Sequence, residues 1–129
     1  MAWRNYGNKY GNHKVTVDGE TFDSKHEYLR YAELQSLQKH GYIYDLQRQV
    51  KFVLVPAQHE PDTVGPRGGK IKGKLIEKEV AYYADFCYYD KDTGCYVVED
   101  AKSPATRTPE YIIKRKLMLF LKGIKIVEV

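Results

Sequence analysis

The sequence has few cysteines and no long apolar run, and each absence excludes a class of protein. Its 129 residues include two cysteines, Cys87 and Cys95, which excludes the disulfide framework of small secreted domains. No Cys/His spacing matches a zinc site. No run approaches the ~20 apolar residues of a membrane helix, and the first residues lack an apolar signal region. We therefore expect a soluble cytoplasmic protein without membrane contacts, whose cysteines are free thiols.

Length and charge narrow the remaining possibilities. A chain of 129 residues can bury most of its apolar surface as one domain, residues 1–129. Its net charge of +4 is uneven: residues 101–129 carry seven Lys or Arg and two Glu, whereas residues 1–100 carry fourteen Lys or Arg and fifteen acids. A basic C-terminal quarter suits a polyanionic partner, but a solvated helix face explains it equally well.

Residues 80–102 are the part around which we organise the rest of the chain. Two runs rich in aromatic and β-branched residues flank the polar segment 90–94, which ends in glycine. This pattern predicts a β-hairpin. A turn at residues 92–93 fixes the expected register of its two strands, and a longer turn would change it.

The hairpin brings charged side chains together. Because side chains alternate along a strand, Asp100 and Lys102 should share one face and Glu99 should point to the other. The expected register places Asp85 opposite Asp100, with Cβ atoms about 5 Å apart. Two facing carboxylates repel each other, so a fold that keeps them usually holds a cation between them.

Local signals predict the other helices and strands. A capping box begins the first helix at Ser24, and Thr108 with Pro109 begins the second; Gly41 and Gly123 end them. The expected order is hairpin, helix, three strands, helix and strand, which is an α/β fold with a mixed central sheet flanked by helices. These elements cover residues 14–22, 24–40, 42–55, 80–102, 108–122 and 124–129.

Two segments lack a regular pattern. Residues 1–13 contain Asn, Gly, Tyr and Lys without a period, and we expect a flexible arm. Residues 56–79 contain three prolines, four glycines and five Lys or Arg, which indicates a basic mobile loop. Its alternating lysines would suit an extended segment along phosphates, although a solvated loop is an equal alternative; they are Lys70, Lys72 and Lys74.

Two polar side chains have both a structural and a functional interpretation. Glu27 is fully explained as the partner of Ser24 in the capping box, and this local pattern favours the cap over a site role. Gln49 precedes the apolar end of its strand and is better explained as an ordinary strand amide than as a site residue.

The context of one triplet indicates chemistry. The chain has two acid-x-lysine triplets, Asp23-Ser24-Lys25 and Asp100-Ala101-Lys102. The second ends a β-run, follows the strand of Asp85 and precedes a basic helix. Two carboxylates suit a hard divalent cation such as Mg²⁺, and a nearby ammonium neutralises charge that develops on a phosphoryl group. This set predicts metal-assisted phosphodiester hydrolysis.

The same residues resemble the PD-(D/E)xK nuclease superfamily, whose restriction-endonuclease-like core has the order αβββαβ. The segments 22–27, 83–86 and 98–102 look like a small phage-associated endodeoxyribonuclease family within it, and the likeness spans about residues 14–129. Ala84 stands where proline is common in the superfamily. The N-terminal hairpin would precede the core.

The resemblance implies a role for each site residue. Asp85, Asp100 and the Ala101 carbonyl would bind Mg²⁺ or Mn²⁺, Lys102 would be the catalytic lysine, and Glu27 would assist through a metal-bound water. This implication raises the site role of Glu27 above the cap alone. The basic residues expected to contact DNA are Lys70, Lys72, Lys74, Arg107, Lys114 and Arg115.

Three classes of function remain, and the third is a globular protein with a basic helix and no nucleic-acid role, which predicts no salt-dependent DNA affinity. Related small nucleases include resolvases of branched DNA, transposon end-cleaving subunits and restriction enzymes. We favour structure-selective or weakly specific cleavage of branched or recombination-intermediate DNA such as Holliday junctions. The expected partner is duplex or branched DNA, and we expect a homodimer and a phage or prophage protein in a bacterial host. The alternative is a non-catalytic nucleic-acid-binding domain of the same fold. Mg²⁺-dependent cleavage discriminates between them.

Overall fold

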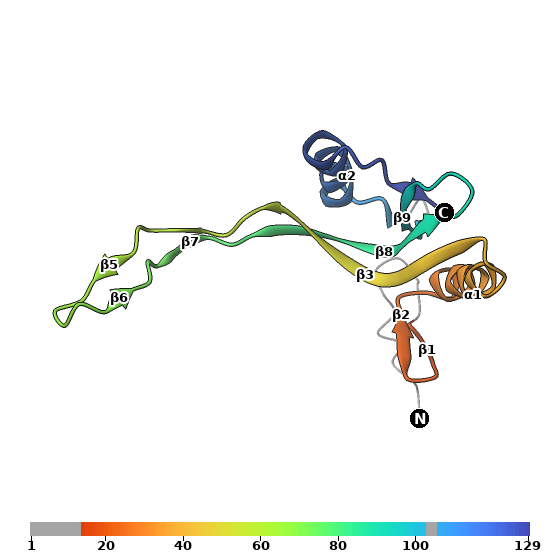
Figure 1. The fold of residues 1–129 in the computed structure, drawn as a ribbon, viewed down its shortest axis with the longest axis horizontal. Coiled ribbons are helices and arrows are strands. Elements are labelled where there is room, and N and C mark those ends of the chain that lie inside the picture. Colours follow the sequence, from red (N-terminus) through yellow and green to blue (C-terminus); the bar gives the residue numbers. More distant parts are fainter. Residues whose placement is uncertain (1–13, 103–105) are drawn as a thin grey trace, which may run out of the picture.

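The computed structural model describes residues 14–102 and 106–129, so the expected flexible arm at residues 1–13 lies outside the described residues. Two helices and ten strands form a body and a long projection (Figure 1). Their bounds are β1 (Val15–Val17), β2 (Glu20–Phe22), α1 (Lys25–Lys39), β3 (Ile43–Val55), β4 (Gln58–His59), β5 (Thr63–Val64), β6 (Lys70–Ile71), β7 (Leu75–Glu77), β8 (Val80–Asp90), β9 (Tyr96–Asp100), α2 (Pro109–Lys122) and β10 (Val127–Glu128).

The body is built on a mixed four-stranded sheet, as the sequence predicts. The strand order is β10-β9-β8-β3. β8 pairs antiparallel with both β3 and β9, whereas β10 pairs parallel with β9. The parallel pair is possible because α2 carries the chain from the end of β9 back to the start of β10. The fold is therefore α/β with a mixed central sheet and two helices.

The β8–β9 hairpin has the predicted register with a different turn. Phe86 pairs with Glu99 and Tyr89 with Tyr96, and continuing this register places Asp85 opposite Asp100. The strands separate after Asp90, whose backbone N–H donates to the Cys95 carbonyl. The turn is thus longer than the expected two residues. Its extra residues are divided equally between the two strands, so the register is unchanged.

Both helices begin at the predicted caps. The Ser24 side chain accepts from the backbone N–H of Glu27 at 3.1 Å, and the Thr108 side chain accepts from that of Tyr111 at 3.2 Å. α2 ends at Gly123, whose φ of 66° is the left-handed conformation that favours glycine. These local signals fix where each helix meets the sheet.

The helices pack on opposite faces of the sheet, α1 on one and α2 on the other (Figure 1). On the α1 face, Leu34 packs with Phe86 and Tyr88. On the α2 face, Met118 packs with Val98. Neighbouring residues of β9 alternate between these two cores, as the pleat requires. The sheet thereby carries a separate apolar cluster on each side.

Both cysteines belong to the β8–β9 hairpin, Cys87 within β8 and Cys95 just before β9. Cys87 is buried, Cys95 is exposed, and both are free thiols. Within the described ranges, neither helix has the length and apolar character needed to cross a membrane.

The expected loop at residues 56–79 is instead a β-hairpin arm, defined here as those residues, so that prediction is wrong about its structure. β4 pairs with β7, and β5 pairs with β6. The arm continues the β3–β8 ladder away from the body (Figure 1). The sequence does not reveal this pairing for two reasons. Prolines and glycines interrupt the segment, and the two ladders are too short to show an alternating pattern.

Gly73 lies where the two ladders of the arm meet. A Cβ there would stand 1.7 Å from the Glu60 carbonyl oxygen, which is backbone and cannot rotate away. The Gly73 N–H donates to the Asp62 carboxylate at 2.7 Å, and this bond, with the Lys70 ammonium, lowers the pKa of Asp62. Only glycine allows the strands to approach this closely.

We predict that Gly73→Ala separates the strands of the arm without unfolding the body. Amide hydrogen exchange should quicken at residues 58–77, while the global unfolding midpoint changes little because the arm lies outside both cores. Gly69→Ala is the matched control, since a Cβ there meets no atom within 4 Å. Equal exchange in the two variants would contradict the account of Gly73.

Candidate active site

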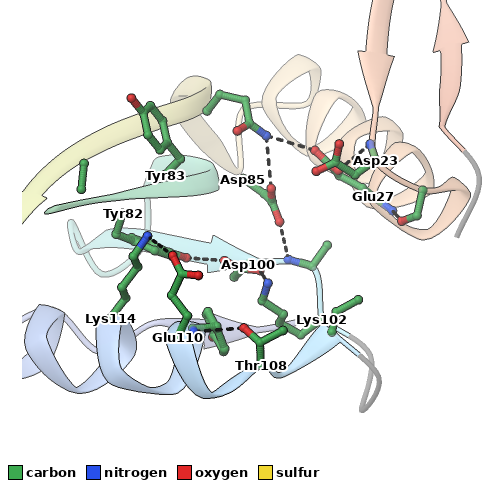
Figure 2. Close-up of a pocket in the computed structure, with 16 residues that line it drawn as sticks. Asp23, Glu27, Tyr82, Tyr83, Asp85, Asp100, Lys102, Thr108, Glu110 and Lys114 are labelled. Carbon is green, nitrogen blue, oxygen red and sulfur yellow. Dashed lines mark hydrogen bonds and ion pairs between the residues drawn. The ribbon is translucent and has the colours of Figure 1, made fainter. Parts of the chain in front are cut away.

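A polar pocket of about 360 Å³ opens where the first half of β8 and the end of β9 meet the starts of both helices. Figure 2 shows carboxylates from α1, β8 and β9 directed toward this space. Every residue expected to act in catalysis lines it, together with Gln49, Tyr111 and Lys114; the predicted set is Glu27, Asp85, Asp100, Ala101 and Lys102. Residues far apart in sequence therefore form one site.

The two strand carboxylates are each fixed by a hydrogen bond. The Asp85 Oδ2 accepts from the backbone N–H of Ala101 at 2.8 Å. The Asp100 Oδ2 accepts from the Tyr82 hydroxyl at 2.5 Å. Burial, and then the charge of Asp100, raise the pKa of Tyr82, so its hydroxyl remains a donor. These bonds hold both carboxylates beside each other despite their repulsion.

Glu27 serves the helix cap and the pocket together. Its Oε2 accepts from the backbone N–H of Asp23 at 3.0 Å, one residue before the N-cap that a capping box would use. Its Oε1 lies 3.7 Å from the Arg48 guanidinium. The side chain is 3% exposed and lines the pocket. The cap thus orients a carboxylate that the site shares.

Gln49, which the sequence indicates as an ordinary strand amide, bridges two carboxylates of the pocket. Its Nε2 donates to the Glu27 Oε1 at 3.3 Å and to the Asp85 Oδ1 at 3.2 Å. Its φ is 51°, a left-handed conformation inside a strand, which is rare for a residue with a Cβ. Such backbone strain clusters at functional sites. No local sequence signal indicates it, because the two carboxylates come from other elements.

Lys102 completes the group. Its Nζ lies 3.1 Å from the Asp100 Oδ1 and 4.2 Å from the centre of the Tyr111 ring. The carboxylate and the ring face both attract the positive charge of the ammonium and hold the side chain in place. The Tyr111 hydroxyl is buried and has no hydrogen-bond partner among the described residues, so the pocket wall offers a free polar group beside this lysine.

The pocket is short of positive charge. Burial, with the neighbouring charges of Asp100 and Glu27, raises the pKa of Asp85 to about 8, against the opposing Ala101 N–H and Lys102. Burial also raises the pKa of Glu27. Carboxyls that resist ionisation in this way gain most from a bound cation.

The oxygen donors fit a hard divalent ion in type. Carboxylates and a backbone carbonyl are the ligands that Mg²⁺ takes, and the ion retains waters as its other ligands. Within residues 14–102 and 106–129, however, no three His, Cys, Asp or Glu side chains already have the spacing of a metal centre. Glu27, Asp85 and Asp100 would therefore have to move closer to hold the ion.

Glu99 lies outside the site, as the alternation predicts. Its carboxylate accepts from Arg30 of α1 at 2.7 and 3.0 Å and from the Tyr88 hydroxyl at 2.5 Å. The side chain is fully buried. Because its charge is paired and its oxygens are hydrogen-bonded, Glu99 attaches α1 to the sheet.

The residues expected to contact DNA do not form one surface. Lys114 lines the pocket and pairs with Glu110 at 2.9 Å. Arg107 and Arg115 both pair with Glu128, at 2.8 and 3.0 Å. The three lysines at positions 70, 72 and 74 lie on the distal arm and do not line the pocket. Of these six residues, Lys114 alone lines the pocket.

We predict that Asp85→Asn removes a pH-dependent loss of stability. The pKa of Asp85 is higher in the folded protein than in the unfolded chain, so its contribution is full below about pH 4 and is lost as the pH rises toward about 8. In metal-free buffer, the variant should gain stability relative to wild type between about pH 5 and pH 9. Thermal unfolding measures this, with exposed Asp92→Asn as the control; a pH-independent difference would contradict the prediction.

We also predict that Gln49→Glu lowers stability by roughly 1 kcal/mol near pH 8, because a third carboxylate replaces the donor between Glu27 and Asp85. The loss should shrink near pH 5, where Asp85 is protonated. Denaturant unfolding measures it. Gln47→Glu on the same strand is the matched control, and an equal loss in both variants would show that the bridging amide is unimportant.

Comparison with known proteins identifies the family without a function. Searches of curated proteins and of solved structures each returned no match. The model of the family described as Protein of unknown function (DUF1064) matches residues 7–125. This match spans most of the chain, including every residue of the pocket. The chain therefore belongs to the DUF1064 family.

Proposed function

We propose that this protein is a Mg²⁺-dependent endodeoxyribonuclease that hydrolyses DNA phosphodiester bonds. One observation carries the proposal: Glu27, Asp85, Asp100 and Lys102 line a single open pocket. They come from three separate segments of the chain, namely α1, β8 and the end of β9 with the two residues that follow it, so no single local motif explains their convergence. The resemblance of their motifs to PD-(D/E)xK nucleases supports the same chemistry, and Mn²⁺ would be an alternative ion.

The carboxylates would hold the metal. Asp85 and Asp100, with the Ala101 carbonyl, supply oxygen ligands, and Glu27 stands across the pocket to assist. When bound, the ion would polarise the phosphoryl oxygen and lower the pKa of a water ligand. Tyr82 orients Asp100 through its hydroxyl, and the Ala101 N–H orients Asp85. These two hydrogen bonds orient the carboxylates toward the pocket, and the bound ion would draw the donors closer together.

Lys102 would act on the phosphate. Its ammonium is held at 3.1 Å from Asp100 and remains partly accessible to the pocket. A fixed cation there neutralises negative charge that develops on the phosphoryl oxygens or orients the attacking water. The Tyr111 ring beneath it limits its movement. This is the role that the lysine of the resembled motif implies.

Basic residues around the pocket would bind the flanking DNA. Lys114 is the nearest, because it lines the same pocket. Arg107 and Arg115 share Glu128, so two positive charges face one negative charge and a net positive charge remains for a phosphate. The lysines of the distal arm would extend the contact. Phosphate contacts of this kind position DNA without reading its sequence.

Branched DNA is the substrate that the resemblance favours. Resolvases of branched DNA are among the related small nucleases, so we propose structure-selective cleavage of recombination intermediates such as Holliday junctions. Symmetrical cutting of a junction needs two active sites, which a homodimer would provide. The resembled family also suggests a phage or prophage source.

One observation favours a second candidate, a non-catalytic nucleic-acid-binding domain. The described carboxylates are not yet spaced as a metal centre, and each already accepts a hydrogen bond from the protein. A domain that had lost its metal would keep the fold and the basic residues. This candidate predicts DNA binding that is independent of divalent ions.

The test is Mg²⁺-dependent cleavage of supercoiled plasmid, linear duplex, flap and four-way junction DNA. Wild type should cleave with Mg²⁺ and not with EDTA. Asp100→Asn and Lys102→Ala should each lower the rate by at least about 100-fold, because each removes charge from the reaction centre. DNA affinity measured without metal should stay close to that of wild type.

The matched controls are Asp92→Asn and Lys91→Ala, which make the same changes in the exposed β8–β9 turn. Both should cleave as wild type does. Binding without cleavage in wild type would establish the second candidate. Full activity in Asp100→Asn or Lys102→Ala would place the reaction elsewhere on the protein.

A further inference from the structure

The β-hairpin arm, residues 56–79, is the largest feature that the catalytic pocket does not use. Every residue in it is exposed except Gly65 and Gly73, which are half-buried. It contributes no residue to either apolar cluster of the body. Nothing in the stability of the body therefore requires an ordered projection of this length, and its regular pairing points to a partner outside the body.

The arm is nevertheless built to be ordered. The β5–β6 pair closes in a tight turn, where the Gly65 N–H donates to the Gly69 carbonyl at 2.7 Å. At the junction, the Glu60 N–H donates to the Lys74 carbonyl at 2.8 Å. The Asp62 side chain also accepts from the Gly73 N–H. These bonds keep the two strands together as far as the tip.

Charge is concentrated at the tip. Residues 66–74 contain Arg67, Lys70, Lys72 and Lys74 and no acidic residue, so this short segment has a formal charge as large as that of the whole chain. Asp62 compensates one lysine, with its carboxylate 3.1 Å from the Lys70 Nζ. The rest of the arm contains four acids and one lysine, so the whole arm has a formal charge of +1 and its positive charge is gathered in residues 66–74. A polyanion is the partner that this distribution complements.

The shape of the β-hairpin arm favours duplex DNA over other polyanions. We infer that the arm is a two-stranded β-ribbon that enters the major groove of double-helical DNA while the body holds the scissile phosphate; this inference rests on the proposed function. The major groove admits a two-stranded ribbon. Lys70 lies on one face of the ribbon, opposite Val64, and would reach the phosphates. Exposed Ile71 lies on the other face, opposite Thr63, and would contact base edges and thymine methyl groups.

The length of the arm gives a footprint. Lys70 and Asp85 lie on the same returning strand of the long hairpin, 15 residues apart. This mostly extended chain spans at most roughly 50 Å, which is about 15 base pairs of duplex. The arm therefore contributes to affinity only when duplex continues about that far to one side of the pocket.

The experiment measures DNA affinity without metal, so that it does not depend on hydrolysis. Fluorescence anisotropy in EDTA would compare the triple variant Lys70→Gln, Lys72→Gln, Lys74→Gln with wild type on a duplex of about 40 base pairs. Affinity at about 100 mM salt should fall about tenfold or more, and the slope of log K against log salt should become shallower by about 2 to 3, as expected for three lost phosphate contacts.

Two further variants isolate the charge of the arm. Lys39→Gln, Lys91→Gln, Lys125→Gln removes equal charge from exposed sites outside the arm and should bind nearly as wild type. Lys70→Arg, Lys72→Arg, Lys74→Arg keeps the charge and should retain affinity, which separates lost contacts from a disordered arm. Equal loss in the two glutamine variants would overturn the inference.

DNA length and strandedness test the groove assignment. On a duplex of about 10 base pairs, the arm variant and wild type should bind equally, because the DNA is shorter than the footprint. Equal loss on single-stranded DNA would overturn the duplex assignment. An arm-dependent dimer that Ile71→Asp abolishes, with DNA affinity unchanged in the glutamine triple variant, would assign the arm to a second copy of the chain instead.

Failure of this inference is distinguishable from failure of the proposed function. Arm-dependent duplex binding by a protein that never cleaves would retain the ribbon and remove the nuclease. Cleavage that is insensitive to the arm lysines, with unchanged affinity in the glutamine triple variant, would retain the nuclease and remove the ribbon.

Discussion

The pairing of β8 with both of its neighbours is the constraint on which the rest of the structure depends. Its ladder with β9 sets Asp85 opposite Asp100, and its ladder with β3 sets Gln49 beside Asp85. The same two strands, β3 and β8, continue outward into the arm. Strand pairing permits only discrete registers, so a slip of one residue would turn each of these side chains toward the opposite face. The site and the projection therefore share one structural origin.

The adjacent acids Glu99 and Asp100 show how the sheet separates structure from chemistry. The pleat sends Glu99 toward α1, where Arg30 neutralises it, and Asp100 toward the pocket, where Tyr82 and Lys102 surround it. A buried carboxylate needs a partner charge or a raised pKa. Glu99 has the first solution. Asp85, opposite Asp100, has a raised pKa. A bound cation would stabilise its charged form, and this is the physical basis of the proposed metal site.

The body and the arm are stabilised in different ways, and we propose a different role for each. The body has an apolar cluster on each face of its sheet and a pocket whose side chains are fixed by hydrogen bonds. The arm has no core, and backbone pairing with one essential glycine, Gly73, keeps it in shape. A domain of this size can thus reach well beyond its own surface without enlarging its core.

The sequence by itself determined the elements whose signals are local. Side-chain caps at Ser24 and Thr108 placed both helices, and alternation through the 80–102 hairpin predicted its register and the opposite directions of Glu99 and Asp100. Only the tertiary structure decided what depends on distant partners. The bridging amide of Gln49 and its left-handed backbone exist because α1 and β8 bring Glu27 and Asp85 to it. The pairing of residues 56–79 was equally hidden, since backbone hydrogen bonds between short, exposed strands leave no hydrophobic period in the sequence.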